Sequence, residues 1–222
     1  MKLNLETFLR SLQSVLKLSK LKGIDAQIKM SPMIDNVPYR PLTPVGTPKP
    51  SSVLLLLIGM DLDSLNILLT LRSSNVQHHK RQISFPGGHC EKGEDYVATA
   101  LREVREEIGL NTDEIRIIGM LSPLYVPPSE TLVYPIVGHI ARIDDLRINY
   151  DEVEEVIFQP LYYFLDDSKR TTEKWLWEGK QIDVPMWKIH NDVPLWGATA
   201  MILSEFVEIV KDIMYQGDYE QE

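Results

Sequence analysis

The chain has 222 residues, a formal net charge of -9 at pH 7 and a sequence pI near 5.1. This acidic balance argues against a protein that binds the backbone of nucleic acids, because that task needs a basic face. The single cysteine, Cys90, excludes an internal disulfide. The longest apolar run, residues 53–58, is far shorter than the roughly 20 residues that span a bilayer.

The termini are not expected to carry a targeting signal. The N-terminal MKLNLETFLRSLQ lacks the uninterrupted apolar region of a secretory signal, and the C-terminal DYEQE is not a peroxisomal signal. With the lone cysteine, these features predict a reducing compartment and a cytoplasmic location, with no membrane partner.

Residues 1–52 are predicted to form a helix and a proline-rich strap that pack on the core without making a second domain. An apolar helical stripe runs over residues 5–21, formed by Phe8, Leu12, Val15 and Leu16. Gly23 is a plausible helix stop. Prolines crowd residues 31–52, so this segment should cross the surface in extended form.

The main domain is predicted over residues 53–216. Apolar runs at 53–60 and 65–72 predict two strands of a hairpin, followed by the basic segment SSNVQHHKRQ and a strand at 82–85. Further strands are expected at 115–121 and 132–141, and a hairpin within 175–187. The last helix should begin after Pro194 and end near Gly217, with an apolar stripe made by Ile202, Phe206, Ile209 and Ile213.

The segment from Gly87 to Leu110 carries the chemistry. An apolar stripe predicts a helix from Asp95 onward, formed by Val97, Leu101, Val104 and Ile108 and ended by Gly109. Three acids lie together off this stripe: Glu103, Glu106 and Glu107. At an effective dielectric near 20, two like charges about 4 Å apart repel by roughly 4 kcal/mol. The patch is therefore either a solvated acidic face or a site for a hard divalent cation such as Mg2+.

The flanking residues favour the metal site. The spacing G-x5-E-x7-R-E-U-x-E-E-x-G-U, with U aliphatic, is filled by Gly88, Glu94, Arg102, Glu103, Val104, Glu106, Glu107, Gly109 and Leu110. This segment resembles the Nudix hydrolase signature. The resemblance implies hydrolysis of a diphosphate joined to another moiety, with Mg2+ or Mn2+ held by the catalytic acids Glu103, Glu106 and Glu107. It also implies a structural ion pair between Arg102 and Glu94.

The preceding segment LLTLRSSNVQHHKRQISFPGG resembles the signature of the coenzyme A diphosphatase branch, L-L-T-x-R-[SA]-x3-R-x3-G-x3-F-P-G-G. Two positions depart from it, since Gln77 replaces the second arginine and Arg81 replaces the glycine. Residues predicted to contact the substrate are Arg72, Ser73, His79, Arg81, Gly87 and Gly88. A solvated basic loop is the alternative for the charged members.

The resemblance implies a Nudix-type α/β/α sandwich, with a mixed β-sheet between the acidic helix and the last helix.

The expected substrate is coenzyme A or an acyl derivative, cleaved to phosphopantetheine and 3',5'-ADP. A broader hydrolase of ADP-ribose or dinucleotides is the enzyme alternative, and a catalytically silent nucleotide-binding module is the other. The general base stays open between Glu103 and Glu107, with Glu152 and Glu130 outside the signature. The expected partner is a small nucleotide-diphosphate substrate, and the chain could form a homodimer.

Overall fold

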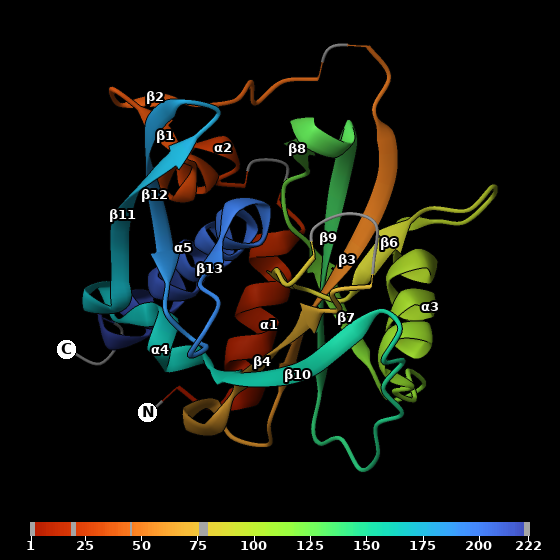
Figure 1. The fold of residues 1–222 in the computed structure, drawn as a ribbon. Helices are drawn as coiled ribbons and strands as arrows, with labels where there is room; N and C mark the ends of the chain where they lie inside the picture. Colours follow the sequence, from red (N-terminus) through yellow and green to blue (C-terminus); the bar gives the residue numbers. More distant parts are fainter. Residues whose placement is uncertain (1–2, 19–20, 45, 76–79, 220–222) are drawn as a thin grey trace.

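The computed structural model describes residues 3–18, 21–44, 46–75 and 80–219 (Figure 1). In chain order the elements are α1 (Leu5–Leu16), α2 (Ile24–Gln27), η1 (Ile28–Met30), β1 (Met33–Ile34), β2 (Val37–Pro38), β3 (Lys49–Ile58), η2 (Leu62–Ser64), β4 (Asn66–Arg72), β5 (Ile83–Ser84), β6 (Gly87–His89), α3 (Tyr96–Ile108), β7 (Arg116–Met120), β8 (Leu124–Val126), η3 (Pro127–Ser129), β9 (Thr131–Ile140), β10 (Val153–Pro160), α4 (Leu161–Leu165), η4 (Asp167–Lys169), β11 (Arg170–Trp177), β12 (Lys180–Trp187), β13 (Leu195–Trp196) and α5 (Gly197–Tyr219).

The central sheet is mixed, as predicted. Its strands follow the order β10-β4-β3-β9-β7, and β3 and β9 run parallel while the other neighbours on this path are antiparallel. The predicted hairpin of residues 53–60 and 65–72 is confirmed as β3 and β4, joined through η2. Short strands extend the sheet where the glycine loop begins, because β5 pairs with β4 and β6 pairs with β3.

Both faces of this sheet are covered, which confirms the sandwich. On β3, Leu54 and Leu56 pack in the cluster that contains Val104 of α3. Leu55 and Leu57 point to the other face, where they share a cluster with residues of α1 and α5. Figure 1 shows α3 on one side of the sheet and α1 and α5 on the other. Burial on both faces explains why β3 is apolar at successive positions instead of alternating.

A second sheet was not predicted. It has the order β11-β12-β1-β2, with β13 also paired to β12. The hairpin predicted within residues 175–187 is confirmed as part of β11 and β12. Residues 31–52 were predicted to cross the surface in extended form, and the prediction did not include the strand pairing found at both ends of the segment. Its start forms the β1–β2 hairpin, turning at Asp35 and Asn36, which both have positive φ. Its last four residues begin β3.

The N-terminal segment is attached to the domain by buried contacts. Helix α1 is shorter than predicted, ending at Leu16, and its Phe8 and Leu12 are fully buried. After it, the buried carboxylate of Glu205 on α5 accepts hydrogen bonds from Gly23 N (2.8 Å) and Gln27 Nε2 (3.0 Å). Among the described residues, no helix combines the length and the apolar character needed to cross a bilayer.

Candidate active site

Helix α3 presents the predicted acids at the edge of the central sheet. Its N-terminus is capped by Asp95, whose side chain accepts a hydrogen bond from Ala98 N at 2.7 Å. Its C-terminus is the left-handed Gly109, with φ of 64°, where a Cβ atom would overlap the backbone of Arg147. The helix predicted from Asp95 onward is therefore confirmed, and both its ends are fixed by local chemistry.

Arg102 joins this helix to the glycine loop. Its Nε donates to Glu94 at 2.8 Å, and its Nη1 donates to Glu103 and Glu106, each at 2.9 Å. Its Nη2 donates to the carbonyl of His89 at 3.0 Å. Hydrogen bonding to Arg102 is the main cause that lowers the pKa of Glu94 to about 2. The Arg102 guanidinium thus connects Glu94, its expected ion-pair partner, with Glu103 and Glu106, which are two of the predicted metal ligands.

Glu107 and Glu103 are desolvated carboxylates. Glu107 is 2% exposed, and burial raises its pKa to about 8. Its Oε1 lies 3.6 Å from Nη1 of Arg72, while its Oε2 is buried without a hydrogen-bond partner among the described residues. Burial also raises the pKa of Glu103. Both side chains therefore favour a cationic partner that would compensate their lost hydration.

These residues fit a hard divalent cation in their chemistry. The donor set is carboxylate oxygen, and the unpartnered Oε2 of Glu107 is a free ligand atom. Within the described residues, however, no three acids, histidines or cysteines are gathered into a ready metal-binding group. Glu106 is 54% exposed and is paired with Arg102. The assignment of Glu103, Glu106 and Glu107 as metal ligands stays a prediction.

The two acids outside the signature lie in different places. Glu152 directly precedes β10, and its negative charge is among the causes that raise the pKa of both Glu103 and Glu107. Glu130 lies in the turn before β9, where its carbonyl accepts from Lys49 N at 2.9 Å. Glu152 therefore acts electrostatically on the partly buried Glu103 and the buried Glu107.

The end of β4 borders Glu107 through Arg72. Arg72 is the last residue of β4, opposite Val153, and its buried Nε has no partner among the described residues. Ser73 is buried, and its hydroxyl accepts from Asn75 N at 3.2 Å. His79 and Gln77 lie outside the described residues. Arg72 is therefore the basic side chain that the structure places at Glu107.

Arg81 is turned to another partner. Its Nη1 lies 2.9 Å from Glu154 on β10, and both side chains are substantially exposed. The predicted contact of Arg81 with a substrate phosphate would require this exposed pair to open, which costs little since such pairs contribute at most about 1 kcal/mol.

Comparisons with known proteins identify the family. A family model described as the NUDIX domain matches residues 48–175, more than half of the chain. The chain belongs to the Nudix family. The human protein named mitochondrial coenzyme A diphosphatase NUDT8 is 36% identical over 68% of this chain and 65% of its own length. The chain thus spans just under two thirds of that relative. Nudix hydrolase 3 of Caenorhabditis elegans is 30% identical over 75% of each chain.

A solved structure supports the same fold. The MutT/nudix family protein from Enterococcus faecalis superimposes with a TM-score of 0.52 over 80% of this chain and 70% of that one, at 18% identity. The names of the relatives place the human protein in mitochondria and a mouse relative, 39% identical over 46% of this chain, in peroxisomes. The cytoplasmic location and the homodimer stay predictions for this Nudix protein.

The structure explains one departure from the branch signature. Arg81 stands where the signature has glycine, and its φ is 51°, in the left-handed region. Residues with a Cβ atom are strained there by about 1–2 kcal/mol, whereas glycine is not. The backbone at position 81 of this Nudix protein thus has a conformation that suits the glycine of the signature, although the residue is an arginine.

Replacing Arg81 tests this strain. Arg81→Gly and Arg81→Ala both remove the ion pair with Glu154, but only glycine relieves the backbone. We expect the glycine variant to be more stable than the alanine variant by about 1 kcal/mol in free energy of unfolding, measured by urea denaturation. An alanine variant as stable as the glycine variant would show that φ at position 81 is not strained.

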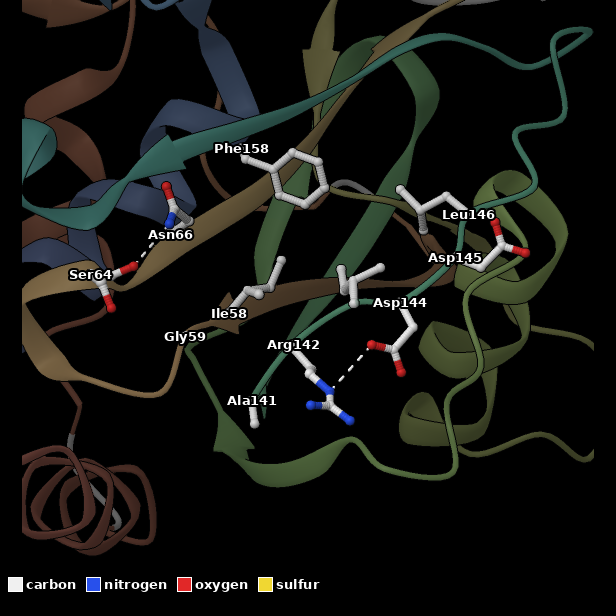
Figure 2. Close-up of a pocket in the computed structure, with 11 residues that line it drawn as sticks. Ile58, Gly59, Ser64, Asn66, Ala141, Arg142, Asp144, Asp145, Leu146 and Phe158 are labelled. Carbon is white, nitrogen blue, oxygen red and sulfur yellow. Dashed lines mark hydrogen bonds and ion pairs between the residues drawn. The ribbon is translucent and has the colours of Figure 1, made fainter.

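An open groove at the other end of β4 carries none of the predicted site residues. Figure 2 shows Ile58 and Phe158 on its apolar floor, with Arg142 paired to Asp144 at 3.2 Å on its rim. Asn66, the first residue of β4, also lines it and donates to the carbonyl of Ser64 at 2.9 Å. Arg72 and the buried acids lie at the opposite end of the same strand.

Sequence reasoning missed Tyr96. Its ring stacks on Tyr134 with centroids 3.6 Å apart and an interplanar angle of 9°. The hydrogen bond to Tyr96 is the main cause that raises the pKa of Tyr134 to about 12. One ring face of Tyr134 is thus already covered, and Tyr125 is buried, which leaves less aromatic surface free for stacking on a base. Tyr96 is the first residue of α3, directly after the cap Asp95. Its place within the signature was the one sequence feature that could have drawn attention to it.

Proposed function

We propose that this Nudix protein hydrolyses the diphosphate bond of coenzyme A or an acyl derivative, yielding phosphopantetheine and 3',5'-ADP. The observation that carries the proposal is the buried Glu107, with an unpartnered Oε2 and its other oxygen facing Arg72. The coenzyme A diphosphatases among the relatives, at 36% and 34% identity, support this choice of substrate.

Glu103, Glu106 and Glu107 would hold Mg2+ or Mn2+. The bound cation would supply electrophilic polarisation and neutralise charge on the diphosphate. Arg72 would bind a phosphate through the Nε that lacks a protein partner. Gly88 lets the loop lie close to the Glu103 carboxylate, and Gly87 lets it lie close to the backbone of β3, because neither carries a side chain. Both glycines would leave room for the diphosphate.

The remaining step is the activation of water. A carboxylate takes the proton while the water oxygen bonds to one phosphorus, and the bridging oxygen leaves with the other phosphate. Glu152 is our candidate for this base, because it comes from a separate segment and acts on both Glu103 and Glu107. Glu103 and Glu107 are the other candidates.

The first test compares turnover of coenzyme A, 3'-dephospho-coenzyme A and ADP-ribose, each with Mg2+ and with Mn2+. A preference for coenzyme A of at least about tenfold in kcat/KM is expected if the 3'-phosphate is recognised, since one charge-assisted contact contributes roughly 1.5 kcal/mol or more. Equal or better cleavage of the other two would favour the broader hydrolase, an alternative motivated by Gln77 and Arg81. Absence of turnover on all three would favour the silent nucleotide-binding module.

A further inference from the structure

The segment after β9 returns to the end of the acidic helix. Arg147 N donates to the carbonyl of Ile108 at 2.8 Å, and Asn149 N donates to the carbonyl of Glu107 at 2.9 Å. These carbonyls belong to the last turn of α3, where partners within the helix are missing. The segment is therefore held in register with the helix that carries the acids.

Asn149 then builds the turn that leads into β10. Its carbonyl accepts from Glu152 N at 3.0 Å and from Val153 N at 2.8 Å. Its Oδ1 accepts from Asp151 N at 3.2 Å. Its remaining side-chain group, Nδ2, donates to Oε1 of Glu152 at 3.3 Å. One side chain thus both closes the turn and contacts the acid.

Glu152 is held from the other side as well. Its carbonyl accepts from Ser73 N at 2.8 Å, next to Arg72 at the end of β4. The backbone of Glu152 is therefore fixed between α3 and β4, but its long side chain keeps rotational freedom. The hydrogen bond from Asn149 is the described contact that restrains the carboxylate itself.

We propose that Asn149 is a positioning residue that keeps the Glu152 carboxylate turned towards Glu103 and Glu107. This inference rests on the proposed function, because it assigns Glu152 a place beside the cation and the diphosphate. A negative charge held there attracts a cation whether or not it binds the cation directly. Asn149 has no such charge and acts only through Glu152.

The test is a double-mutant cycle of Asn149→Ser and Glu152→Gln. Serine can still accept from Asp151 N in a similar turn, but its hydroxyl is too short to reach Glu152. We expect Asn149→Ser to lower kcat about tenfold with KM within about twofold. In the Glu152→Gln background the same change should alter kcat by less than about twofold. If the reductions in kcat caused by the two single substitutions multiplied in the double variant, the two residues would act independently and the proposal would be overturned.

Binding of Mn2+, measured by calorimetry, separates this inference from the proposed function. Asn149→Ser should weaken Mn2+ binding about threefold or more, and should add nothing to the weakening caused by Glu152→Gln. Mn2+ binding can be measured without turnover. The binding cycle would therefore still test the role of Asn149 if the protein cleaved none of the diphosphates. Mn2+ affinity unchanged by Asn149→Ser, or independent losses, would contradict the positioning role.

Two further variants serve as a specificity control and as a replacement in case Asn149→Ser does not fold. Asn66→Ser makes the same substitution in the groove at the far end of β4 and should leave Mn2+ affinity unchanged. If Asn149→Ser does not fold, Asn149→Asp is used instead, since it keeps the acceptor oxygen and replaces only the donor. It should also lower kcat, because its carboxylate repels Glu152, and wild-type kcat in a folded Asn149→Asp variant would count against the proposal.

Discussion

Glu107→Gln is expected to reduce kcat by about 10²- to 10⁴-fold while leaving the protein folded. The substitution keeps the size of a side chain that is only 2% exposed, but it removes the carboxyl group that faces Arg72 and would bind the proposed cation in its ionised form. Because burial already favours the neutral form of Glu107, replacing it by the neutral glutamine should not destabilise the fold. Steady-state kinetics with Mg2+ and thermal unfolding measure the two effects together.

The matched control is Glu114→Gln, which changes an exposed glutamate after the helix. It should retain wild-type kcat and thermal stability. Near wild-type turnover in Glu107→Gln would remove Glu107 from the mechanism. A large drop in melting temperature would instead show that the ion pair with Arg72 supports the fold.

Gly88→Ala should lower kcat/KM by about 100-fold with little change in stability. A Cβ atom at position 88 would overlap the Glu103 carboxylate, which lies at the end of a flexible side chain and can move aside. The displacement costs the fold little, but it moves a proposed metal ligand, and a shift of about 1 Å can cost about 100-fold in rate.

Gly87→Ala provides the contrast. There the added Cβ would collide with the backbone of Ser52 and Val53, which cannot move aside cheaply. We expect Gly87→Ala to lower the free energy of unfolding by about 3 kcal/mol or more, because the added atom is packed against atoms that cannot move. If Gly88→Ala lost activity equally in a Glu103→Ala background, displacement of Glu103 would not be its mechanism.

Local patterns predicted the elements whose causes are local. The stripe ending at Ile108 and the stop at Gly109 are close together in the chain, and α3 forms where they predict it. The apolar runs around Leu55 and Leu68 likewise formed the predicted hairpin. The ion pair between Glu94 and Arg102, which the resemblance implied, is present in the structure.

The acidic helix could be predicted from the sequence because its apolar stripe repeats over a short stretch of chain, and the family and the sandwich followed from the resemblance of residues 88–110 to the Nudix signature. Only the tertiary structure decided that Met33 pairs with Asp183 in a second sheet, and that Asn149 meets Glu107 and Glu152. It also turned Arg81 towards Glu154 in a left-handed conformation. Such contacts depend on register and packing between distant segments, and no periodicity within either segment encodes them.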